Sequence, residues 1–121
     1  MFISTFRTLL LLFALALTTL APSLFVPDAS GVWRIELRNE AAAETITVTL
    51  LQEDSLLSGH YLGQFGPSLL QGTMEHDAIA FSYAIDGMRV IHLGTIVGNT
   101  ISGFYHAGDI DQGAFKGRKI R

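Results

Sequence analysis

Three tyrosines recur at a fixed interval in this chain, since Tyr61, Tyr83 and Tyr105 lie 22 residues apart. His92 lies between the last two of them. An imidazole beside a phenol can take up and return a proton, as a general base does in hydrolysis or isomerisation. An enzyme of hydrolytic or isomerase type that uses His92 and a neighbouring tyrosine is therefore one hypothesis. A hydrogen-bonded core histidine is the simpler one.

The other chemically capable residues match no catalytic or metal-binding motif. His60 and His106 share one parity and could form a metal pair, but no carboxylate joins them in an obvious way. The stretch "GDIDQG" at 108–113 resembles a calcium loop, yet Ala114 and Ile120 stand where such a loop needs glycine and glutamate. The chain has no cysteine and no Gly-x-Ser-x-Gly motif. We therefore expect no metal, no cofactor and a function other than catalysis.

The 22-residue interval fits a β-hairpin of two strands of about eight residues with short turns. Apolar and polar residues alternate in "WRIELR" at 33–38 and "TITVTL" at 45–50, which is typical of half-buried strands. Asp86-Gly87 and Gly98-Asn99 are hairpin turn signals. The pattern predicts eight strands, at 31–38, 45–52, 56–63, 68–74, 78–85, 88–97, 100–107 and 113–120.

Eight successive hairpin-linked strands predict an all-β, antiparallel up-and-down meander. An open meander would leave two edges and one bare face, so closure into a small barrel is favoured. The shared parity predicts that five side chains face the lumen as candidate ligand contacts: Trp33, Tyr61, Tyr83, His92 and Tyr105. We expect His92 and Gln71 to be the hydrogen-bond partners of the buried phenols. These large side chains favour a filled lumen over a hollow one.

The two ends of the barrel sequence predict a structural clasp. In a closed meander the start of the first strand lies beside the end of the last. A cation from "GRKIR" can then lie across the indole of Trp33. Arg121 is the first candidate for this contact, followed by Lys119 and Arg118.

The barrel sequence resembles a known superfamily. "GVW" at 31–33 opens the first strand and "FKGRKIR" at 115–121 closes the last. This pattern is similar to that of the calycins (lipocalins, avidins and fatty-acid-binding proteins), and to small exported β-barrel domains of bacteria. The resemblance implies the barrel fold. It implies no particular ligand, because avidin-like pockets are lined by several tryptophans and Trp33 is the only one here.

The N-terminus predicts export. Arg7 precedes an uncharged apolar stretch from Thr8 to Val26, and Ala21-Pro22-Ser23 offers a small-residue cleavage site. These features are typical of a signal peptide with a signal helix, here residues 1–23; the alternative is an uncleaved membrane anchor. Residues 24–30 would form a linker and residues 31–121 the barrel domain. A periplasmic or extracellular location follows, with membrane contact only through an uncleaved N-terminal segment.

The charge balance bears on the partner. The net charge is −3, and it becomes −4 without Arg7, so the chain lacks the basic surface that nucleic acid requires. The sequence thus indicates an exported, non-enzymatic β-barrel that binds a small molecule or a protein. A carrier that holds an apolar ligand in the lumen is the alternative form of this hypothesis.

Overall fold

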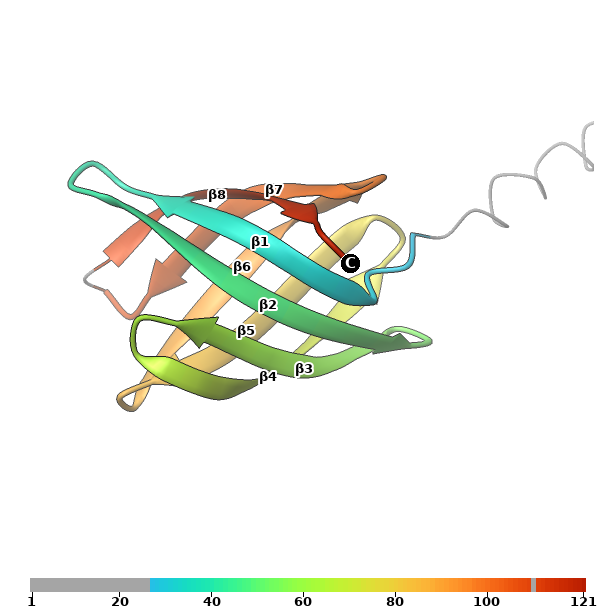
Figure 1. Ribbon diagram of the computed structural model, residues 1–121, viewed down its shortest axis with the longest axis horizontal. Helices are drawn as coiled ribbons and strands as arrows, with labels where there is room; N and C mark the ends of the chain where they lie inside the picture. The colour runs from blue at the N-terminus through green and yellow to red at the C-terminus, as the bar shows by residue number, and fades with distance from the viewer. Residues whose placement is uncertain (1–26, 110) are drawn as a thin grey trace, which may run out of the picture.

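The computed structural model describes residues 27–109 and 111–121, which form a closed antiparallel barrel of eight strands (Figure 1). The strands are β1 (Gly31–Arg38), β2 (Ala43–Glu53), β3 (Leu56–Gly63), β4 (Gly66–Glu75), β5 (Ala78–Ile85), β6 (Met88–Val97), β7 (Thr100–Ala107) and β8 (Asp111–Lys119). The predicted all-β up-and-down barrel is therefore confirmed. The predicted signal helix lies outside the described residues. Within those residues, no helix is long and apolar enough to cross a membrane.

The barrel closes where the first strand meets the last. β1 pairs antiparallel with both β2 and β8, and the register places Trp33 opposite Lys119 and Leu37 opposite Phe115. Five strands have the predicted bounds, whereas β2, β4 and β8 begin two residues earlier than predicted. All three early starts lie at the same end of the barrel, so the strands extend further at this end than the sequence pattern indicated.

Tight turns join the hairpins. Asp86 and Gly87 have φ angles of 50° and 81°, so both occupy the left-handed region that a type I′ turn requires. Gly98, with φ of 61°, begins the other turn predicted from a glycine–asparagine pair. Such turns twist in the same sense as the flanking strands, which keeps the meander in register.

The core fills the barrel because alternate residues of each strand point inward. Small residues set how closely the strands approach. Gly94 of β6 faces Gly103 of β7, and a Cβ atom on either would collide with the backbone of the neighbouring strand. The buried apolar side chains of the strands are Trp33, Ile35, Leu37, Ile46, Val48, Leu50, Leu57, Tyr61, Leu70, Met74, Ile79, Phe81, Tyr83, Val90, Ile96, Ile101, Tyr105, Ala107 and Phe115.

A short segment before β1 closes one end of the barrel. Residues 27–30, here called the strap, place Ala29 in full burial, and its carbonyl accepts a hydrogen bond of 2.9 Å from Trp33 Nε1. The backbone amide of Ala29 donates to Gln52 Oε1 at 2.8 Å. The backbone amide of Gln52 donates to Ser30 Oγ, also at 2.8 Å. Figure 1 shows the strap and the C-terminus together at this end. These residues, which we expected to belong to a linker, are therefore part of the barrel's packing.

Candidate functional site

A group of aromatic rings centred on His92 fills the middle of the lumen. Phe81 stacks on the imidazole with ring centroids 4.5 Å apart, and Phe115 meets it edge-on at 4.8 Å. The Tyr83 hydroxyl and His92 Nε2 are hydrogen-bonded at 2.9 Å, and Tyr61 stacks on Tyr83 at 4.2 Å. All three repeated tyrosines are buried, as their shared parity predicted.

Burial sets the protonation of this group. Desolvation lowers the pKa of His92 to about 3, so its imidazole is neutral at pH 7. Desolvation also raises the pKa of the Tyr83 hydroxyl, which therefore keeps its proton. His92 is fully buried, and its Nδ1 has no partner among the described residues. Gln71, expected as a second phenol partner, is instead exposed on the outer face of β4, so that prediction was wrong.

A pocket of about 260 Å³ opens at the end of the barrel opposite the strap. We call it the mouth pocket. Its walls combine apolar side chains with phenols and carboxylates. The lining residues are Leu37, Glu44, Tyr61, Phe65, Tyr83, Ile85, Asp86, Met88, Val90, Tyr105, Ala107 and Asp111. A concave, mainly apolar site with a few polar groups is the usual form of a small-molecule pocket, and the volume of this one is slightly below the usual range of about 300–1,000 Å³.

Two buried oxygen atoms in the mouth pocket have no hydrogen-bond partner among the described residues. They are the Tyr61 hydroxyl and Glu44 Oε2. The Tyr61 hydroxyl reaches the Cα of Gly63, two residues nearer the mouth, where any Cβ atom would collide with it. Burial first, and then the negative charge of Glu44, raise the pKa of Tyr61. An unpaired buried polar group is unfavourable by about 1–3 kcal/mol, so these atoms are suited to an external partner.

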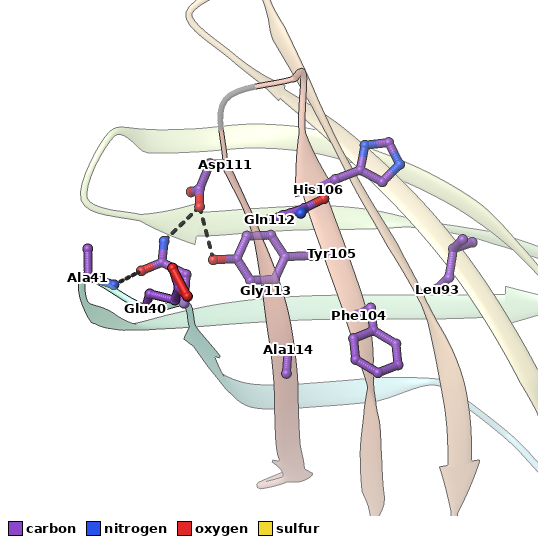
Figure 2. Close-up of a pocket in the computed structure, with 11 residues that line it drawn as sticks. Glu40, Ala41, Leu93, Phe104, Tyr105, His106, Asp111, Gln112, Gly113 and Ala114 are labelled. Atoms are coloured by element: carbon purple, nitrogen blue, oxygen red, sulfur yellow. Dashed lines mark hydrogen bonds between the residues drawn. The ribbon is translucent and has the colours of Figure 1, made fainter.

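The rim of the mouth pocket also carries the Asp111 carboxylate, on β8. Asp111 Oδ1 accepts a hydrogen bond of 2.7 Å from Asn39 Nδ2 and a longer one of 3.4 Å from the Tyr105 hydroxyl. Figure 2 shows this group from the outer side of the barrel, with Tyr105 directed toward Asp111. The network fixes the β1–β2 and β7–β8 ends of the mouth against each other.

Figure 2 also shows an open groove outside the barrel, along β7 and β8. Its volume is about 820 Å³, and Leu93 and Phe104 lie side by side along it as register partners. The outer side chains of this groove are largely solvated: Phe104 is 73% exposed. The described part of the chain contains no group of three or more histidine, aspartate or glutamate side chains placed to hold a metal ion.

The structure separates the five predicted lumen residues into two groups. Tyr61, Tyr83 and Tyr105 line the mouth pocket, and His92 lies beneath it and supports Tyr83. Trp33 is at the opposite end, under the strap. His60, His76 and His106 are exposed.

Sequence reasoning missed the carboxylates of the mouth. Glu44 has the parity of Ile46 and Val48, and Asp111 that of Phe115, but both precede the predicted strand starts. A signal was present, since extending each alternation by one inward position would have included them.

The clasp at the closed end uses a different cation from the one ranked first. The Lys119 ammonium lies 5.4 Å from the centroid of Trp33 and donates to the Asp28 carbonyl at 3.1 Å. The side chain of Arg121 is exposed, and its carbonyl accepts a hydrogen bond from the Val32 amide at 2.8 Å. Lys119 fits because inward parity brings it opposite Trp33 in the register, whereas Arg121 lies beyond the end of β8.

The fold and the pocket together define a class: a closed eight-stranded antiparallel barrel with a small site at one end, an architecture compatible with the calycin fold. No protein-family model matches the chain, and no curated protein matches it.

Proposed function

We propose that this protein is an exported, calycin-like barrel that binds a small molecule with an apolar body in the mouth pocket. One observation carries the proposal: Tyr61 is 1% exposed, and its buried hydroxyl reaches toward the mouth and has no partner among the described residues. The Glu44 oxygen in the same pocket is in the same condition. Core packing alone does not favour such groups, whereas a bound polar molecule would satisfy them.

The proposal reconciles the filled and hollow versions of the barrel. The middle of the lumen is occupied by the His92 group, and the mouth pocket is open. A pocket of about 260 Å³ corresponds to roughly nine water molecules at about 30 Å³ each, which suits a ligand the size of one substituted ring. Export rests on the sequence of residues 1–23.

Ligand-observed NMR with small monocyclic compounds tests the proposal. The test uses two matched substitutions in the full chain. Ala107→Phe places a ring in the mouth pocket, whereas Ala114→Phe makes the same change on the exposed face of β8. We expect bound compounds to be lost with Ala107→Phe and kept with Ala114→Phe, with thermal unfolding confirming that both variants fold. Equal binding to both variants, or no binding to the unaltered protein, contradicts the proposal.

A further inference from the structure

The mouth pocket is acidic as well as apolar. Glu44, Asp86 and Asp111 contribute carboxylates, and no lysine, arginine or histidine is among its described lining residues. Like charges across a contact are unfavourable, so this pocket disfavours an anionic ligand. A neutral or cationic ligand remains.

The position of Glu44 distinguishes between these two. Its side chain points inward from β2 beside Leu37, and one carboxylate oxygen is buried without a partner in the described structure. Its negative charge contributes, after burial, to raising the pKa of Tyr61, Tyr83 and Tyr105, and all four residues line the mouth pocket. Buried charges in proteins are normally paired, and a charged donor forms a stronger hydrogen bond to a carboxylate than a neutral donor does.

Tyr61 supplies an independent indication of the same ligand contact. Its hydroxyl is buried and faces the same pocket, and it can accept a hydrogen bond as well as donate one. A protonated amine carries several N–H donors. One such group can therefore satisfy both the carboxylate oxygen of Glu44 and the phenol oxygen of Tyr61.

An organic cation fits better than an inorganic one. The described carboxylates do not converge in a cluster of three that could hold a metal ion. Ile85, Met88 and Val90 provide apolar walls that would contact the body of an organic molecule. We infer that the mouth pocket selects a small primary amine, with its ammonium group on Glu44 and Tyr61 and its apolar body against these walls. This inference rests on the proposed function.

Isothermal titration calorimetry with three similar probes tests the inference: 2-phenylethylamine, 2-phenylethanol and phenylacetate. We expect the full chain to bind the amine about tenfold or more tightly than the alcohol, with the anion weakest, because the alcohol lacks the ammonium charge that pairs with the Glu44 carboxylate. Added calcium chloride should not displace the amine beyond what sodium chloride does at equal ionic strength.

Matched charge variants locate the effect. Glu44→Gln should reduce amine affinity about tenfold and alcohol affinity by a smaller factor, while thermal unfolding shows that the variant folds. Glu75→Gln makes the same charge change at the closed end of β4 and should change neither. Equal binding of amine and alcohol, or calcium-specific displacement, overturns the selection of an amine while leaving the pocket proposal intact. Failure of all three probes to bind overturns both.

Discussion

Tyr61 and Tyr83 are chemically alike and stacked on each other, yet their hydroxyl groups differ in one respect. The Tyr83 hydroxyl is hydrogen-bonded to His92, whereas the Tyr61 hydroxyl has no partner among the described residues. Removing a partnered hydroxyl leaves its partner unsatisfied, but removing an unpartnered one relieves a penalty. The Tyr83 hydroxyl therefore contributes to the stability of the barrel, whereas the Tyr61 hydroxyl is available to a ligand.

The first prediction follows from this contrast. Tyr61→Phe should raise the free energy of unfolding by about 1 kcal/mol, and Tyr83→Phe should lower it by about 1–3 kcal/mol because His92 Nε2 loses its partner. Urea unfolding of the two variants measures both changes. Tyr61→Phe should also weaken binding in the mouth pocket. A comparable loss of stability in both variants would show that the Tyr61 hydroxyl is already satisfied in the unliganded protein.

The second prediction concerns the pH dependence of stability. His92 has a pKa of about 3 when folded and about 6.5 when unfolded, so between these values the unfolded chain binds one more proton. Its contribution to the free energy of unfolding is full above pH 6.5 and falls by about 1.4 kcal/mol per unit as the pH drops toward 3. No carboxylate is among the ring neighbours described around it to offset this; they are Phe81, Tyr83, Tyr105 and Phe115.

His92→Gln keeps a hydrogen-bonding side chain at this position but cannot take up a proton in this range. Urea unfolding at a series of pH values from 7 to 5 should therefore show a shallower decline in stability for the variant. His76→Gln, which alters an exposed histidine in a turn, should retain the slope of the unaltered protein. Parallel pH curves for the unaltered protein and His92→Gln would show that the imidazole can be protonated in the folded barrel.

At the scale of elements, the strap covers one end of the barrel. It is held by main-chain groups of Ala29 and by the side chain of Gln52, which accepts from the strap and donates to the Asp54 carbonyl. No regular secondary structure supports it. Its attachment therefore depends on a few hydrogen bonds and on the burial of Ala29.

The third prediction tests that attachment. Gln52→Ala should lower the free energy of unfolding by about 1–2 kcal/mol, because the buried Ala29 amide loses its acceptor. Gln71→Ala, the same change on the outer face of β4, should stay within about 0.5 kcal/mol. Hydrogen exchange of the Ala29 amide should accelerate in the first variant only. Equal stability of the two variants would mean that burial of Ala29 alone holds the strap.

Sequence reasoning was accurate where alternation was continuous and failed where it ended. The inward parity of Tyr61 and Tyr83 and the turn at Asp86-Gly87 could be predicted because strand geometry and turn chemistry are local. Glu44 lies one inward position before the predicted start of its strand, and the alternation alone does not require that extension, since a charged residue at a strand end is compatible with either strand or loop. The strap has no periodicity, so nothing local indicated that it packs in the barrel.

At the scale of the whole molecule, the two ends of the barrel differ. The strap and the end of β8 lie together at one end, and the mouth pocket lies at the other. The strap also restricts how much of the chain can be removed without loss of packing. Cleavage beyond Asp28 would take away the residues that close the barrel.

The fourth prediction follows for an exported chain. The mature N-terminus should lie between Ala21 and Asp28, because the strap residues up to Ser30 are part of the folded barrel. Intact-mass measurement of the protein recovered after export determines the cleavage site. Unchanged full-length mass in a membrane fraction would contradict cleavage and favour the anchor. A mature chain that starts at Gly31 would contradict the role of the strap.

The arrangement of the ends has a practical consequence. The chain enters the barrel at its closed end, beside the strap. A lipid bilayer, a bead or a fused enzyme joined before Pro27 is therefore attached at that end. The mouth pocket lies at the opposite end of the barrel, so the point of attachment does not cover the opening. Immobilising the protein through its N-terminus should therefore leave the mouth pocket accessible to the sample without any redesign of the chain.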